Sequence, residues 1–147
     1  MSVTAEQIAD VLGGRRILGR RVRSMRDLES VIRAGIPRGA LDAFIGQLIA
    51  ARSGADASVQ LRNKIVPRAT YQRVARLNLQ VSETTERLAR LYALALSVFE
   101  DRAAAARFLM TAHPELEGRA PFDVALTEIG GREVEEIIER GLHGLPA

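Results

Sequence analysis

The segment from Ser82 to Phe99 constrains the fold of this chain more than any other stretch. Its apolar residues recur at helical spacing and then widen until they cover most of the helix surface; they are Leu88, Leu91, Tyr92, Leu94, Ala95, Leu96, Val98 and Phe99. A helix that is apolar on most sides must be surrounded by other elements. We therefore expect a long helix, capped by Ser82, at the centre of the fold or of a dimer.

The rest of the chain is also patterned as helices joined by turns, because no stretch shows sustained alternation of β-branched and polar residues. Ser24 with Asp27 predicts one helix start, and Pro37 predicts the next. Further helices are expected over 59–65, 69–77 and 101–112, and a short one from Pro121. Gly130–Gly131 is expected to break the chain, and the last helix then presents Val134, Ile137 and Ile138. The predicted fold class is all-α.

Composition excludes several classes of site. The chain has no cysteine, so it can form neither a disulfide nor a thiolate metal site. Its two histidines, His113 and His143, lie far apart, and we expect no metal and no cofactor. The first residues lack the apolar stretch of a signal peptide, and no run approaches the length of a membrane span. A cytoplasmic protein without a membrane partner is the expectation.

Charge is divided unevenly along the chain. Residues 1–76 hold 14 Lys/Arg and 6 Asp/Glu, a net charge of +8, whereas residues 77–147 hold 7 and 12, a net charge of −5. The two sum to the net charge of +3 for the whole chain. This division favours two partners, one of them a polyanion that meets the basic half. The alternative is that the basic half is an ordinary solvated surface.

The stretch "LRNKIVPRATYQRVARL" predicts two short helices joined by a tight turn, as in a helix-turn-helix. The second helix would run over about 69–77 and carry the donors that reach phosphates or base edges. The candidate DNA-binding residues are Arg68, Thr70, Tyr71, Gln72, Arg73 and Arg76. The alternative is a surface helix that is merely rich in arginine.

No constellation of residues predicts catalysis, and we do not expect an enzyme. His113 precedes a proline and is better placed to end a helix than to accept a proton. The serines and threonines have no apparent base, and no glycine loop of the phosphate-binding kind occurs. In the central helix, Glu83–Arg87 and Glu86–Arg90 are spaced as ordinary helix-surface ion pairs.

The last residues, "GLHGLPA", follow a helix that we expect to end at Gly141. This segment is short and partly apolar, and it can bend at Gly144. Its two leucines favour a docking role over a frayed terminus.

Four segments in order resemble the Xre/MbcA/ParS-type antitoxins of bacterial toxin–antitoxin operons, from about residue 25 onward. They are "GIPRGALDAF", "VPRATYQR", "SETTERLARLYALALSVFED" and "AAAARFLMTAHPELEGRAPFDVALTEIGGREVEEIIERGLHG". The last is the most specific, with its turn marked by Leu116, Gly118 and Pro121. The chain departs from the family at Phe108, where Trp is common, at Ala120, where a Thr or Ser cap is usual, and at Arg73–Val74, where two arginines are common.

The weak pattern of the first residues predicts a weakly ordered segment over 1–24. The resemblance implies an all-α fold with a helix-turn-helix region over 25–80 and a dimerisation and toxin-binding domain with its tail over 81–147. The implied partner is a RES/ParT-type toxin encoded in the same operon, which resembles ADP-ribosyltransferases and consumes NAD. The C-terminal end of the antitoxin would block the toxin's NAD pocket. The implied toxin-binding residues are Arg119, Glu128, Arg140, Leu142, His143, Gly144 and Leu145.

The resemblance also implies a homodimer and repression of its own operon through operator DNA. Two alternatives stay open. One is a stand-alone helix-turn-helix transcriptional regulator whose second half only dimerises. The other is a helical adaptor that has no role on DNA.

Overall fold

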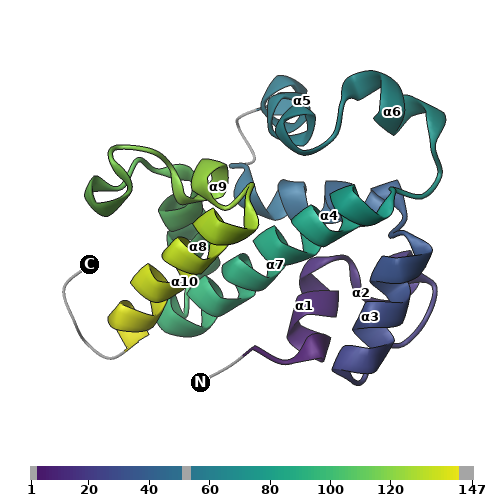
Figure 1. Ribbon diagram of the computed structural model, residues 1–147, viewed down its shortest axis with the longest axis horizontal. Helices are drawn as coiled ribbons and strands as arrows, with labels where there is room; N and C mark the ends of the chain where they lie inside the picture. Colours follow the sequence, from purple (N-terminus) through teal and green to yellow (C-terminus); the bar gives the residue numbers. More distant parts are fainter. Residues whose placement is uncertain (1–2, 51–53, 143–147) are drawn as a thin grey trace.

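The computed structural model describes residues 3–50 and 54–142, and of Leu142 only the backbone. These residues form helices and contain no strand (Figure 1). In chain order the helices are α1 (Ala5–Val11), α2 (Gly14–Leu18), α3 (Met25–Ala34), α4 (Arg38–Leu48), α5 (Gly54–Ile65), α6 (Arg68–Arg73), α7 (Leu79–Phe99), α8 (Arg102–Met110), the 3₁₀ helix η1 (Pro114–Leu116), α9 (Pro121–Val124) and α10 (Glu128–Leu142). The prediction of an all-α fold is confirmed.

Helix α7 is the central element. It contacts α1, α3, α5, α8 and α10, so helices of its own chain surround it (Figure 1). Leu88, Ala89, Tyr92 and Ala95 are completely buried. The prediction of a central helix is confirmed, and α7 needs no second chain to bury these residues.

The start of α7 differs from the sequence prediction. The helix begins at Leu79, and its cap is Asn78, whose side-chain oxygen accepts a hydrogen bond from the Val81 N–H at 2.8 Å. Ser82 was expected to be the cap. Its hydroxyl instead accepts from the Ile36 N–H at 3.1 Å and donates to the Leu77 carbonyl at 3.2 Å. A buried serine in the first turns of α7 therefore fastens the chain between α3 and α4.

Residues 1–24 were predicted to be weakly ordered; of these, residues 3–24 are described and contain α1 and α2. Thr4 and Gln7 form a reciprocal capping box at the start of α1. Ile8 and Leu12 lie one helical turn apart and are completely buried. Because α1 packs against both α3 and α7, its few apolar residues are enough to hold the segment in place.

No helix within the described part of the chain combines the length and the apolar character needed to cross a membrane.

Candidate functional site

The C-terminal half is built on α7. Helix α10 lies alongside α7 with α9 at its start, and α8 packs against α7 as well (Figure 1). Val134, Ile137 and Ile138 form the buried stripe of α10 that was predicted from their spacing. Asp101 caps α8 by accepting from the Ala103 N–H at 3.1 Å.

The sequence predicted a break at Gly130–Gly131, and this prediction is wrong. Both glycines lie inside the first turns of α10. A Cβ at Gly130 would lie 1.8 Å from the Val124 carbonyl oxygen, and one at Gly131 would lie 2.7 Å from the Arg87 side chain. Both glycines therefore allow α10 to approach the end of α9 and α7 closely. Helix α10 starts earlier because Thr127 caps it, accepting from the Gly130 N–H at 3.0 Å.

Arg87 holds the link between α9 and α10, a role that the sequence did not predict. One of its guanidinium nitrogens donates to the carbonyls of Ala125 and Leu126, at 3.1 and 3.2 Å. Its Nε lies 3.4 Å from Glu128. The expected Glu83–Arg87 pair does not form, whereas Arg90 pairs with Glu86 at 3.1 Å as expected. Helical spacing allows both pairs. In the fold, however, Arg87 contacts the residues between α9 and α10 instead of Glu83.

Glu128 begins α10 and has arginines on two sides. Burial by itself would raise the pKa of Glu128, but the positive charge of Arg87 and the hydrogen bond from Arg132 outweigh it and hold that pKa below its ordinary value. Arg132 lies 3.5 Å away, one turn along the same helix. Glu128 is therefore ionised and paired at neutral pH.

The turn between α8 and α9 closes on itself. The His113 N–H donates to the Arg119 carbonyl at 3.0 Å, and His113 Nδ1 accepts from the Glu115 N–H at 3.1 Å. Glu117 and Gly118 adopt left-handed backbone angles, with φ of 57° and 78°, which reverse the chain. The Glu115 side chain forms an ion pair with Arg140, so this turn is tied to the end of α10.

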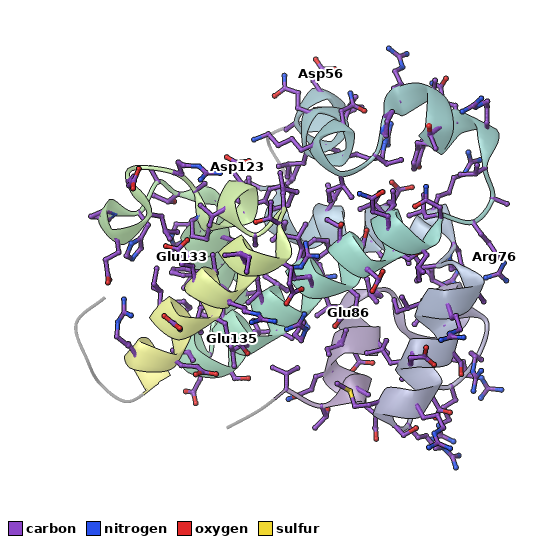
Figure 2. All side chains as sticks on the ribbon, in the orientation of Figure 1. Asp56, Arg76, Glu86, Asp123, Glu133 and Glu135 are labelled. Carbon is purple, nitrogen blue, oxygen red and sulfur yellow. The ribbon has the colours of Figure 1, made fainter. Side chains whose placement is uncertain are left out.

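The outward face of α10 is acidic. Four carboxylates on this helix form no ion pair with any described residue; they are Glu133, Glu135, Glu136 and Glu139. Glu133 and Glu135 lie on the part of the surface away from α3 and Arg76 (Figure 2). Ile129 stands at the start of this helix with 71% of its surface exposed. The face thus combines unpaired negative charge with one bare apolar residue.

Residues 94–144 match the family model of the antitoxin Xre/MbcA/ParS C-terminal toxin-binding domain. The matched segment runs from the last turns of α7 through α10 and so contains the closed turn and the acidic face. The resemblance inferred from the sequence is confirmed over this segment. Because the family is an antitoxin toxin-binding domain, the match supports an antitoxin role and a toxin partner. A search of curated proteins found no match to the chain.

Except for Leu145, the predicted toxin-binding residues lie within the matched segment, where they fall into separate groups. Arg119 is exposed on the closed turn, and Arg140 is joined to the same turn through Glu115. Glu128 lies at the other end of α10, about 18 Å from Arg140 at the rise of an α-helix. Leu142 is the last described residue. His143, Gly144 and Leu145 lie outside the described residues.

The two short helices predicted for this stretch correspond to α5 and α6, but α6 is shorter than expected. It ends at Arg73, and Val74 has extended backbone angles, with φ of −115° and ψ of 143°. Arg68, Gln72 and Arg73 are exposed, and Thr70 is half-buried. These side chains remain available to an outside partner.

Two of the predicted DNA-binding residues are engaged within the chain. The Tyr71 hydroxyl donates to Asp42 at 2.5 Å, and the Arg62 guanidinium lies 3.8 Å from the centre of its ring. Arg76 donates to the Gly35 carbonyl at 3.0 Å. Tyr71 and Arg76 therefore join the loop around α6 to α3 and α4.

Proposed function

We propose that this chain is the antitoxin of a RES/ParT-type toxin, and that it inhibits the toxin by placing its C-terminal end at the NAD site. The match of residues 94–144 to a toxin-binding domain carries the proposal. The proposal adds the type of toxin and the mode of inhibition to the general antitoxin role.

The acidic face of α10 supports this proposal through its charge. A pocket that holds the phosphates of NAD needs positive charge near its rim. The unpaired carboxylates Glu133, Glu136 and Glu139 supply the opposite charge on a helix that α7 already holds in place. Complementary charges of this kind increase the rate of association and fix the orientation of the complex.

The residues after α10 suit the second step, which is occupation of the pocket. Ligand pockets are concave and mostly apolar, with a few polar groups. Leu142, His143 and Leu145 offer two apolar side chains and one polar ring, and Gly144 permits a sharp bend. Because α10 is already folded, it adds no ordering cost of its own to binding.

Co-expression with the toxin of the same operon tests both steps. We expect the chain truncated after Leu142 to co-purify with the toxin but to leave the cellular NAD level low and growth arrested. The full chain should restore both. As a matched comparison, Glu133→Lys with Glu136→Lys keeps the tail but reverses the docking charge, and this variant should lose co-purification.

Protection by the truncated chain would show that docking alone inhibits and would overturn the role of the tail. Failure of the full chain to bind any RES/ParT-type toxin would overturn the proposed partner.

We also propose that the complex represses its own operon through α6, namely through the exposed Arg68, Gln72 and Arg73 and the half-buried Thr70. An electrophoretic shift on the operon's promoter tests this. Arg68→Ala with Arg73→Ala should abolish the preference for promoter over unrelated DNA, since base contacts specify the sequence. An unchanged preference would remove α6 from the interface.

Self-association belongs to the same proposal. A groove of about 480 Å³ between α3 and α7 contains Met25 and Leu79, which are 58% and 52% exposed. Its rim carries charges of both signs, so a two-fold axis can pair each sign with its opposite in a second copy. Leu79→Glu should convert a dimer into a monomer in light scattering. A wild-type monomer in solution would contradict this step.

A further inference from the structure

Six arginines follow one another closely in the sequence from α2 to the first turn of α3, outside both regions discussed so far. This N-terminal arginine cluster consists of Arg15, Arg16, Arg20, Arg21, Arg23 and Arg26, and all six are exposed. No acidic residue lies between the first and the last of them. Among the described residues, only Arg20 forms an ion pair, with Asp27 at 3.1 Å. The cluster is therefore the densest block of uncompensated positive charge on the sequence.

The cluster is carried by a fixed scaffold. Leu18 and Val22 are buried between the arginines and anchor α2 and the loop after it. Gly19 has a left-handed backbone, with φ of 79°, which ends α2. Ser24 then caps α3, accepting from the Asp27 N–H at 3.1 Å. The guanidinium groups are thus held on an ordered backbone, which lowers the entropic cost of binding a partner.

The cluster and α6 meet the fold at the same end of α4. Helix α2 packs against α4, and a Cβ on Gly39 would lie 3.6 Å from the Ile17 side chain. The next residue toward the start of α4, Arg38, donates to the Tyr71 carbonyl of α6 at 3.1 Å. Figure 1 shows α2, α3 and α6 on the same side of the molecule, away from α10. One partner of sufficient length can therefore touch both segments.

We propose that the N-terminal arginine cluster binds the phosphate backbone of duplex DNA, and that it supplies most of the affinity while α6 supplies contacts to base edges. The proposal rests on the proposed DNA role of α6. The guanidinium group matches phosphate geometry with two parallel hydrogen bonds. Duplex DNA offers a phosphate charge about every 1.7 Å along its axis, so a compact arginine cluster can meet several at once. Backbone contacts position a protein without reading the sequence, which suits residues that lack a recognition helix.

A salt titration tests the proposal on the full chain. The probe is a labelled duplex of about 20 base pairs with unrelated sequence, measured by anisotropy between about 50 and 200 mM salt. For Arg15→Ala with Arg16→Ala and Arg21→Ala, we expect affinity to fall by about tenfold or more and the salt slope of log K to decrease by about 2 to 3. These three side chains form no ion pair with any described residue, so thermal unfolding should be unchanged.

The matched control removes the same charge from the other half, through Arg102→Ala, Arg107→Ala and Arg132→Ala. This control should retain most of the affinity and the slope. Equal losses in the two triple variants would mean that net charge alone drives binding and would overturn the proposal. A cluster variant that loses binding to anionic lipid vesicles but keeps duplex binding would also overturn it. Because the probe has no operator sequence, the result does not depend on whether α6 recognises a promoter.

Discussion

The two halves of the molecule use their charged residues differently. In residues 3–76, several charged side chains hold the fold together: Asp42 and Arg62 enclose Tyr71, and Arg76 binds a backbone carbonyl of α3's end. In residues 77–142, four of the carboxylates of α10, among them Glu133, have no ion-pair partner among the described residues, whereas Glu128 is paired with Arg87 and Arg132. A net charge calculated from the sequence therefore overstates what the basic half can offer at α6, and describes α10 well.

The difference follows from how each half is packed. In the acidic half, α10 rests closely on its neighbours through two glycines, since Gly130 approaches the backbone of Val124 and Gly131 approaches the side chain of Arg87. Helix α6 buries none of its own residues and makes side-chain contacts to α4, while the residues after it pair with the α3–α4 link through the Leu77 N–H, which donates to the Ile36 carbonyl at 2.8 Å. Because Gly130 brings α10 against α9, the outer carboxylates of α10 are not needed to hold the helix, whereas Tyr71 and Arg76 help to hold the segment around α6.

The largest expected effect comes from adding one methyl group at Gly130. Its Cβ would overlap the Val124 carbonyl oxygen, so Gly130→Ala must displace α10 from α9. We expect a loss of roughly 3 kcal/mol in the free energy of unfolding, measured by urea denaturation. The matched change in the basic half is Gly46→Ala, because Gly46 lies within α4 with nothing near its Cβ position. It should stabilise by about 0.5–1 kcal/mol. Equal effects would mean that the two halves tolerate added volume alike.

Ser82 joins the halves, and its loss should be the next largest effect. Ser82→Ala leaves the buried Ile36 N–H without its acceptor, and the fold loses a link between α7 and the start of α4. We expect about 1–3 kcal/mol of destabilisation in urea. Hydrogen exchange of the Ile36 amide should quicken more than that of amides in α10. Uniform quickening throughout α10 would contradict a link between the halves.

The spacing of apolar residues predicted those helices whose position depends on their own sequence pattern. It did not predict the contact between two segments that are separate in the sequence. The apolar width of α7 and the stripe of Val134, Ile137 and Ile138 were sufficient to place those helices. The same reasoning took Gly130–Gly131 for a break, because a glycine pair looks alike whether it ends a helix or permits close packing. Only the position of the Val124 carbonyl distinguishes the two.

The candidate sites were harder to predict than the fold. The family match confirms the resemblance of residues 94–144 to a toxin-binding domain, which was inferred from the order of several motifs. The roles of Tyr71 and Arg76 could not be read from sequence, because their partners Asp42 and Gly35 lie about thirty to forty residues away. A tyrosine hydroxyl and an arginine guanidinium can contact a phosphate as readily as they contact these partners.

Replacing each tyrosine by phenylalanine should change stability less, and it compares a hydroxyl that forms a hydrogen bond with a buried one that has no partner among the described residues. Tyr71→Phe removes the bond to Asp42 and should cost about 0.5–1.5 kcal/mol in the free energy of unfolding. Tyr92→Phe removes a buried hydroxyl with no partner among the described residues and keeps the edge-to-face packing on Phe44. It should be neutral or slightly stabilising. Thermal unfolding of the two variants measures the difference, and destabilisation by Tyr92→Phe would reveal a partner for its hydroxyl.

Alkaline titration should show the smallest effect and tests the same two residues in the unaltered chain. Burial raises the pKa of Tyr92, and burial together with the hydrogen bond to Asp42 raises the pKa of Tyr71. In the unfolded chain both ionise near pH 10, so between that pH and the folded values the unfolded state binds fewer protons. Their contribution to stability is complete below about pH 10 and is lost as the pH rises through the folded values. Because the chain has two tyrosines and no tryptophan, ultraviolet absorbance of tyrosinate reports them directly. We expect no ionisation near pH 10 while the fold persists, and a step at that pH would show that one ring is open to water.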